Sequence, residues 1–155
     1  MRISQGVIEI KNVREFLSKI PDGCVLINSD YVISLDVLKF AVQKALKSWR
    51  EKRNVAKTLS MEILLYVSAT RQINKALKIG LKEGANRVIV VDLNGCLEKL
   101  KELGLKEEDV LQVDDKKIKR IAKFYEIDEE ELNLVGKEKL PLLIRERIVL
   151  FDITK

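Results

Sequence analysis

TLSMEILLYVSATRQINKALKIG, residues 58–80, is the stretch from which the fold of this chain is most easily read. Its first half is a compact apolar block at residues 63–67, and its second half is an amphipathic run that contains Ile73 and Leu77. Apolar residues recur at helical spacing in both halves. We therefore predict two helices, one that ends near Ala69 and one that starts at Arg71.

The small polar turn between these two helices is a candidate anion site. Thr70 stands where an N-cap would be, so its hydroxyl would accept a hydrogen bond from a first-turn amide. The remaining free amides, with Arg71 beside them, would form a site for a phosphate or a carboxylate. The alternative is an ordinary corner between two helices in which Arg71 is solvated.

The composition is that of one folded domain. The chain has 155 residues, of which 46% are apolar and 34% charged, so it is long enough to bury a core and too apolar to be disordered. No apolar run approaches the ~20 residues that span a bilayer, and the first ten residues do not resemble a signal peptide. We expect a single domain over residues 1–155, in the cytoplasm, without a membrane partner.

The positive charge is unevenly distributed along the chain. Residues 44–87 contain eleven basic and three acidic side chains, a net charge of +8, whereas the whole chain carries +5. The remaining residues therefore sum to −3. Such asymmetry favours a polyanion such as RNA or DNA as a partner. The alternative is a solvated face on a lysine-rich protein.

Three apolar segments read as strands, at residues 6–11, 24–27 and 87–92, and residues 110–113 are expected to add an edge strand. Helices are expected between them, the longest after an N-cap at Ser34, with a buried stripe that ends at Trp49. Shorter helices are predicted after Asn12, near residues 97–103, after Asp114 or Asp115, after Asp128, and from Pro141 to about Val149. The predicted fold is α/β (α+β), with one mixed sheet of about three to five strands covered by helices.

Patterns that carry catalysis or bind metals are missing from the sequence. Histidine is absent, and the glycines form neither of the common phosphate-binding motifs. Cys24 and Cys96 are far apart and fit no ligand spacing, so we expect two reduced thiols in the core. We predict that the protein is not an enzyme and uses no cofactor and no metal.

The central stretch resembles a known family. The run TLSMEILLYVSATRQINKALKIGL is similar to the hallmark of the small regulatory subunit of the KEOPS complex, the family of the PRPK-binding protein, in its archaeal type. That hallmark is roughly Ser-x-Glu-x-Leu-Leu-Tyr-x-Ser-x-x-Arg-Gln-Ile-x-x-Ala-Leu. The preceding ISLDVLKFAVQKAL resembles the family's apolar segment ahead of a basic linker. Ala69 stands where many members have glycine, and Leu81 where isoleucine is usual.

This resemblance implies a non-catalytic role in tRNA modification. KEOPS makes threonylcarbamoyladenosine next to the anticodon, and its transferase and its kinase-like ATPase are separate subunits. The family resembled here binds and stimulates the kinase-like ATPase subunit and helps recruit tRNA through the single-stranded 3′ CCA end. Two alternatives stay open at this point: a stand-alone basic module that binds any nucleic acid, and a pure protein–protein adaptor whose basic stretch is solvated.

The corner between the two central helices is the predicted tRNA site. A single-stranded end presents phosphates and unstacked bases, which call for basic groups, amides and an apolar surface. We expect Arg71 and the first-turn amides to hold phosphate, Gln72 to read a base edge and Ile73 to pack under a base. The predicted tRNA-binding residues are Lys57, Ser60, Thr70, Arg71, Gln72, Ile73 and Lys75.

The last residues of the chain are unusually apolar, since chain ends are normally frayed and polar. The segment 150–155 either packs back on its own core or docks another protein. For the second case, the candidate contacts with the kinase-like subunit are Leu150, Phe151 and Ile153.

Overall fold

Four strands form one sheet in the order β2-β3-β1-β4, and every neighbouring pair is antiparallel. The computed structural model describes residues 1–155. Its strands are β1 (Arg2–Ile10), β2 (Cys24–Asn28), β3 (Gly84–Asp92) and β4 (Lys106–Glu107). The predicted fold class and number of strands are confirmed, but the sheet is not mixed, because the strands that run in the same direction, β1 with β2 and β3 with β4, are never neighbours in it.

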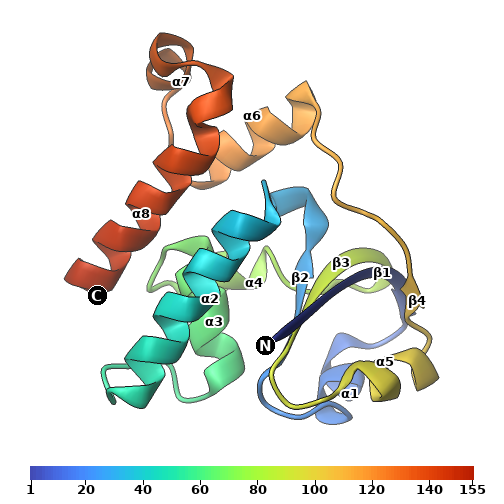
Figure 1. Cartoon of the computed structure of the whole chain (residues 1–155). Helices are drawn as coiled ribbons and strands as arrows, with labels where there is room; N and C mark the ends of the chain where they lie inside the picture. The colour runs from blue at the N-terminus through green and yellow to red at the C-terminus, as the bar shows by residue number, and fades with distance from the viewer.

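Helices lie on both sides of this sheet (Figure 1). The short helices α1 (Val13–Ser18) and α5 (Leu97–Glu102) cover one face, and α2 (Leu35–Arg50), α3 (Leu59–Ser68) and α4 (Ile73–Leu77) lie on the other. Beyond α2 and α3 come α6 (Asp115–Phe124), α7 (Glu129–Val135) and α8 (Leu140–Thr154). Two single turns of 3-10 helix, η1 (Ser29–Tyr31) and η2 (Lys137–Lys139), complete the structure.

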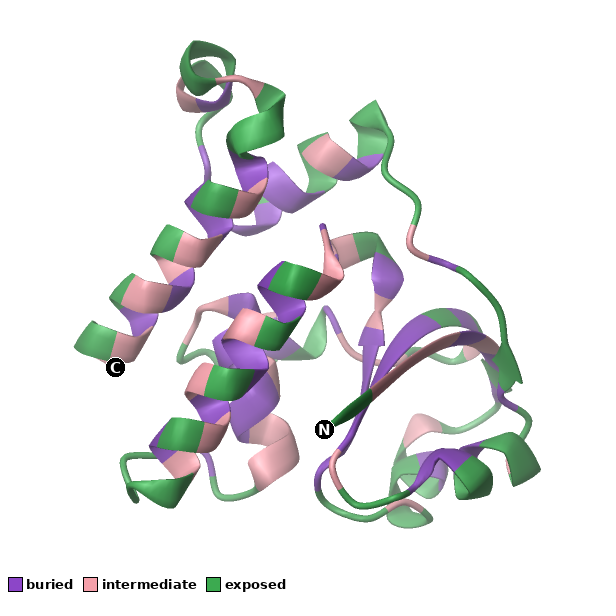
Figure 2. Ribbon diagram, viewed as in Figure 1, coloured by how far each residue is buried: buried purple, intermediate pink, exposed green.

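The edge strand β2 and its neighbour β3 are buried on both faces, as their continuous apolar runs predict (Figure 2). Because side chains alternate along a strand, β2 and β3 feed two separate hydrophobic clusters. Val25, Ile27, Ile89 and Val91 belong to the larger cluster, with residues of α2, α3, α6 and α8. Cys24, Leu26, Val88 and Val90 belong to the smaller one, with residues of α1 and α5.

Side-chain caps fix the starts of most helices where the sequence places them. Asn12 accepts a hydrogen bond from the amide of Glu15 at 2.8 Å, and Ser34 accepts one from the amide of Val37 at 3.2 Å. Thr58, Asp114 and Asp128 cap α3, α6 and α7 in the same way. These polar residues precede amphipathic runs, which is why their capping role can be read from the sequence.

Two predictions about elements are wrong. Residues 110–113 form no strand, because the side-chain oxygen of Gln5 accepts the amides of Val110 and Leu111 in place of a backbone ladder, and the edge strand is the two-residue β4. Trp49 does not join the buried stripe of α2, since it is partly exposed and belongs to neither hydrophobic cluster.

Cys24 and Cys96 are bonded to each other, so the prediction of two reduced thiols is also wrong. The disulfide joins the start of β2 to the N-cap of α5, within the smaller hydrophobic cluster. The two residues are 72 positions apart, and only the pairing of β2 with β3 brings them together.

The C-terminal helices pack on α2 and α3. The ring of Phe151 meets the ring of Tyr66 edge-on with 4.9 Å between centroids, and the hydroxyl of Tyr125 donates to the carbonyl of Val67 at 2.6 Å. The helix α8 continues to Thr154, so the segment expected as a tail is helical. None of the helices combines the length and the hydropathy that crossing a bilayer requires.

Candidate nucleic-acid and partner interfaces

The corner between α3 and α4 is a left-handed helix end. Ala69 has φ 52° and ψ 44°, a conformation in which glycine is less strained than alanine. This conformation lets the amides of Ala69 and Thr70 return to the carbonyls of Tyr66 and Leu65, at 3.2 and 3.1 Å. The last turn of α3 is thereby closed, and residues 69–72 lead into α4.

The second helix starts later than predicted. Its N-cap is Gln72 and its first residue is Ile73, because the hydroxyl of Thr70 accepts the amide of Gln72 at 3.1 Å and so closes a local turn instead of capping a helix. The helix α4 has only five residues, so its dipole is small. Any affinity of this corner for anions therefore depends on side chains more than on amides.

Arg71 is exposed and has no carboxylate within 4.0 Å. Its guanidinium is thus free to bind an external anion. Gln72 is also exposed, and Ile73 is 52% exposed. The same exposure fits the alternative of an ordinary corner with a solvated Arg71, so only a binding experiment separates the two.

Thr70, Arg71 and Lys75 line a hollow of about 410 Å³ between α4 and α8, which we call the corner hollow. Arg147 and the predicted partner residues Leu150 and Phe151 line the same hollow. Lys75 is partly neutralised there, with Nζ 4.0 Å from the carboxylate of Glu126. The structure therefore places the predicted tRNA corner directly beside the predicted docking helix.

A second and more apolar hollow of about 520 Å³ lies on the other side of α4, and we call it the apolar groove. Its walls are mostly aliphatic, and Ser60 is one of its few polar residues. The groove is lined by Val13, Leu17, Ile20, Pro21, Asp22, Cys24, Val25, Leu26, Thr58, Ser60, Met61, Leu64, Leu77, Gly80 and Leu81. Lys57 directly precedes Thr58 at its edge, but Lys57, Gln72 and Ile73 line neither hollow.

The apolar groove also contains backbone polar groups from the free edge of β2. The amides of Cys24 and Asn28 donate away from β3, to the carbonyls of Pro21 and Ile79. Backbone groups of alternate residues in a strand point to the same side. The amide and the carbonyl of Leu26 therefore point away from β3, as the amides of Cys24 and Asn28 do, and face the groove. A ligand in the groove would meet a donor and an acceptor between aliphatic walls.

Asp22 holds the N-terminus of α3 against the groove from outside the helix. Its two carboxylate oxygens accept the amides of Leu59 at 2.9 Å and Ser60 at 2.8 Å, and the hydroxyl of Ser60 accepts the amide of Gly23 at 2.8 Å. Burial opposes ionisation of Asp22, but these hydrogen bonds outweigh it, and the pKa of the carboxyl is lowered. Ser60 therefore makes a structural hydrogen bond with Gly23 and also lines the groove.

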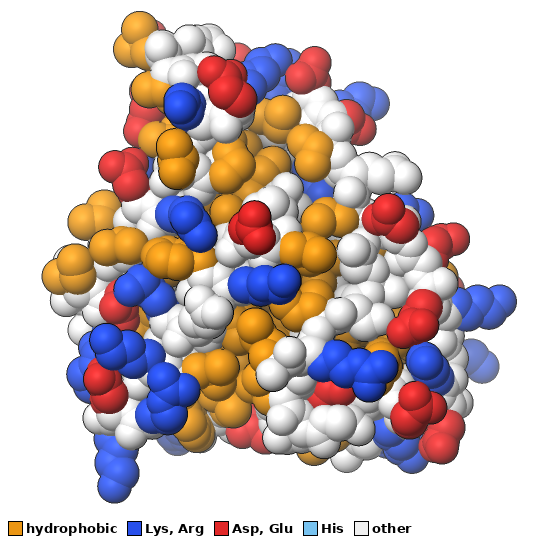
Figure 3. Space-filling view, viewed as in Figure 1, with side chains coloured by type: hydrophobic (Ala, Val, Ile, Leu, Met, Phe, Trp, Pro, Cys, Tyr) orange, Lys and Arg blue, Asp and Glu red, His pale blue; other side chains and the backbone are white.

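The outer face of α8 is apolar and exposed (Figure 3). Leu150 is 54% exposed and Ile153 is 72% exposed, so both are available to a partner. Phe151 is only 6% exposed and packs on Tyr66, so it supports this surface from beneath and does not line its outer face. The segment is therefore core at Phe151 and exposed surface at Leu150 and Ile153.

A buried polar cluster that the sequence did not indicate fastens the end of α8 to α2 and α3. The carboxylate of Glu62 is fully buried and accepts hydrogen bonds from the amides of Val55 and Ala56 and from the hydroxyl of Ser48. It also forms an ion pair with Lys155, with 3.7 Å between the carboxylate oxygen and Nζ. Burial lowers the pKa of Lys155, and the nearby Glu62 opposes this shift.

Asp152 forms the second half of the same cluster. It accepts a hydrogen bond from the hydroxyl of Tyr66 and lies 3.8 Å from the side-chain nitrogens of both Lys44 and Arg53. Burial, together with the hydrogen bond to Asp152, raises the pKa of Tyr66. The residue therefore connects α8 to α2, α3 and the linker between them.

Comparison with known proteins gives consistent matches. Residues 6–152 match the family model described as kinase binding protein CGI-121. The chain is 30% identical over 123 residues to the "KEOPS complex subunit Cgi121" of Pyrococcus abyssi, which covers 76% of this chain and 70% of that protein. It is also 30% identical over 105 residues to the "Regulatory protein Cgi121" of Methanocaldococcus jannaschii, which covers 66% of this chain and 69% of that protein.

Proposed function

The chain belongs to the CGI-121 family of kinase binding proteins, and on this premise we propose that it is a non-catalytic, regulatory subunit of a cytoplasmic KEOPS complex. In this role it binds and stimulates the kinase-like ATPase subunit and recruits tRNA through the 3′ CCA end. The name of the Pyrococcus abyssi relative supports the assembly, and that of the Methanocaldococcus jannaschii relative supports a regulatory role. The motif at residues 58–81 supports both the kinase and the tRNA functions.

The observation that carries the tRNA part is the position of α4 between two hollows of different chemistry. Leu77 of this helix lines the apolar groove, and Lys75, with Arg71 beside the helix, lines the corner hollow. A single-stranded end alternates bases with phosphates, so it needs an apolar site and a basic site within one or two nucleotides of each other. Residues 71–77 offer both.

Each part of the groove matches one part of a nucleotide. The aliphatic side chains can pack on the face of a base, and the peptide group of Leu26 can hydrogen-bond its edge. Lys57 at the edge of the groove and Arg71 at the corner can bind the flanking phosphates. This arrangement moves base recognition from Gln72 to the groove, while Arg71 keeps its predicted role.

Binding of tRNA with an intact or a trimmed 3′ end tests this part. In filter-binding titrations at fixed salt, removal of the three CCA nucleotides should weaken binding by at least roughly 10-fold. This corresponds to a loss of about 1.4 kcal/mol of binding free energy. Double-stranded DNA of similar length should bind no better than the trimmed tRNA. Equal affinity for all three would favour the general nucleic-acid module, and no affinity for any would favour the protein adaptor.

The outer face of α8 is the proposed contact with the kinase-like subunit. Exposed aliphatic side chains at Leu150 and Ile153 give it the apolar character of an interface core. Mixing the two purified proteins should produce a complex on size exclusion and raise the ATPase rate of the kinase-like subunit. Separate elution at micromolar concentration would contradict the assignment.

A further inference from the structure

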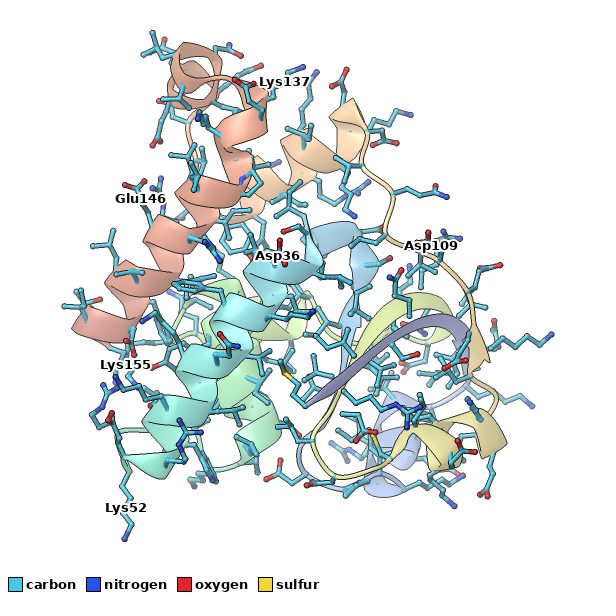
Figure 4. The ribbon with its side chains drawn as sticks, viewed as in Figure 1. Asp36, Lys52, Asp109, Lys137, Glu146 and Lys155 are labelled. Atoms are coloured by element: carbon cyan, nitrogen blue, oxygen red, sulfur yellow. A yellow bond between two sulfur atoms is a disulfide. The ribbon has the colours of Figure 1, made fainter.

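A run of positive charge directly precedes Thr58, which lines the apolar groove. Residues 44–57 contain six basic side chains and one acidic side chain, a net charge of +5, which equals the charge of the whole chain. In the space-filling view, Lys and Arg gather over the C-terminal end of α2 and the linker that follows it (Figure 3). Lys52 projects from this linker into solvent (Figure 4).

Part of this charge is used inside the protein. Lys44 and Arg53 approach the carboxylate of Asp152, and Arg53 also pairs with Glu51 at 3.1 Å. Lys47, Arg50 and Lys52 are exposed and have no carboxylate within 4.0 Å. We call these three residues the linker surface.

The helix dipole explains only part of the positive charge on the linker surface. Lys47 and Arg50 lie in the last turn of α2, where positive charge is favourable. Lys52 lies beyond the helix and has a positive φ of 59°, so no dipole effect explains it. Clustered like charges repel one another, and a polyanion relieves this repulsion.

Trp49, the single tryptophan of the chain, lies between Lys47 and Arg50 in sequence. It is partly exposed and belongs to neither hydrophobic cluster. It adjoins Arg50 in the last turn of α2, so its fluorescence reports on changes at this end of the helix.

We propose that the linker surface binds backbone phosphates of the double-stranded stem that adjoins the 3′ end of the tRNA. This inference rests on the proposed function, because it assumes that the 3′ end occupies the apolar groove. Residues 51–57 lead directly into Thr58 and Ser60 of that groove. On this proposal, RNA that leaves the groove past Lys57 follows this segment toward the linker surface.

Phosphate contacts of this kind give affinity without reading sequence. Each neutralised phosphate adds about 0.9 to the slope of log affinity against log salt for a duplex and about 0.7 for a single strand. Removal of the three charges should therefore change salt dependence as well as affinity, and it should do so only for RNA that carries the stem.

The experiment compares two variants with equal loss of charge. The test variant is Lys47→Gln, Arg50→Gln and Lys52→Gln, and the control is Lys116→Gln, Lys119→Gln and Arg120→Gln on α6. The control residues are also exposed and free of ion pairs, and α6 lies at the opposite end of the molecule from the linker (Figure 1). Each variant is titrated with full-length tRNA and with a short single-stranded RNA that ends in CCA.

The test variant should bind the full tRNA at least roughly 10-fold more weakly, with a salt slope smaller by about two to three. It should bind the short RNA as the unmodified protein does, and the control variant should match the unmodified protein with both RNAs. Trp49 fluorescence should change with full tRNA and not with the short RNA.

Three results would overturn the inference. If the short RNA binds but both variants bind tRNA equally well, the linker surface does not contact the stem and the proposed function stands. If tRNA binding is unchanged and only the complex with the kinase-like subunit is lost, the surface binds a protein. If the short RNA does not bind the unmodified protein, the proposed function fails and the inference fails with it.

Discussion

Lys155 and Glu62 form a buried ion pair, with 3.7 Å between the ammonium nitrogen and the carboxylate. The side chain of Glu62 is fully buried and that of Lys155 is 4% exposed. The pair joins Lys155 to the first turn of α3, so the end of α8 is held by charge as well as by the packing of Phe151.

Removal of the Glu62 carboxylate should strongly destabilise the fold. Glu62→Ala leaves Lys155 without its partner and the amides of Val55 and Ala56 without an acceptor. We expect a loss of about 3–5 kcal/mol in the free energy of unfolding, measured by urea denaturation. The control Glu108→Ala, at an exposed carboxylate without an ion pair, should change it by less than about 0.5 kcal/mol. A loss below about 1 kcal/mol for Glu62→Ala would show that the cluster does not stabilise the fold.

Reversal of charge at the corner should weaken tRNA binding. Arg71→Glu replaces a free guanidinium with a carboxylate that repels phosphate, and we expect affinity to fall roughly 10-fold or more. Lys116→Glu, an equal change of charge on α6, should have a smaller effect. Equal losses for the two variants in a filter-binding titration would count against a tRNA site at the corner.

Two neighbouring positions on α8 should respond in opposite ways. Ile153→Glu changes a side chain that is 72% exposed, so it should abolish co-elution with the kinase-like subunit and leave the melting temperature nearly unchanged. Phe151→Ala removes a buried ring and should cost about 3–5 kcal/mol of folding free energy. A large loss of stability for Ile153→Glu would mean that this position belongs to the core.

Acid should destabilise the protein through Asp22. The hydrogen bonds to its carboxylate lower its pKa from the ordinary value of 3.8, so the unfolded chain binds more protons than the folded one as the pH falls through this range. The stabilisation is fully present above the unfolded pKa and is lost as the pH drops through the lowered, folded pKa. Thermal melts between pH 6 and pH 2.5 should therefore show a shallower acid decline for Asp22→Asn than for the unmodified protein.

The control for the acid effect is Asp36→Asn, since Asp36 is exposed and has no hydrogen-bond or ion-pair partner through its side chain. This variant should keep the acid decline of the unmodified protein. An identical decline for Asp22→Asn would show that the cap on α3 makes no contribution to pH dependence.

Reduction of the disulfide should lower stability. The bond closes a loop of 72 positions, for which chain entropy gives an upper estimate of about 4 kcal/mol. We expect a reductant to shift the urea midpoint of the unmodified protein and to leave the double variant Cys24→Ala, Cys96→Ala unaffected. An unmodified protein that is insensitive to reductant under denaturing conditions would contradict the pairing.

Local sequence signals predicted most of the elements because their causes are local. Ser34 precedes an amphipathic run, and the run at residues 24–27 is uniformly apolar, so α2 and β2 follow from capping and periodicity. The same reasoning failed where a side-chain oxygen accepted a backbone amide that would otherwise have belonged to a predicted helix or strand. Thr70 closed a turn instead of a helix, and Gln5 took the amides that would have made a strand at residues 110–113.

Long-range pairings could not be predicted from the sequence. The bond between Cys24 and Cys96 and the pair of Lys155 with Glu62 depend on contacts that only the folded chain creates. One signal was available in part: Ile144, Ile148 and Phe151 recur at helical spacing, which marks Phe151 as a core residue beside the exposed Leu150. The two hollows on either side of α4 also had no counterpart in the sequence pattern.

The contact between Arg53 and Asp152 has a consequence for how the two proposed interfaces communicate. Arg53 belongs to the basic linker, and Asp152 lies between Leu150 and Ile153 on the docking helix. An RNA phosphate that draws the guanidinium away from Asp152 would leave that carboxylate less neutralised where the partner binds. By thermodynamic reciprocity, the partner would then change the affinity for RNA by the same factor as RNA changes the affinity for the partner. Arg53, as the counter-ion shared by the phosphate and Asp152, would couple the two ligands.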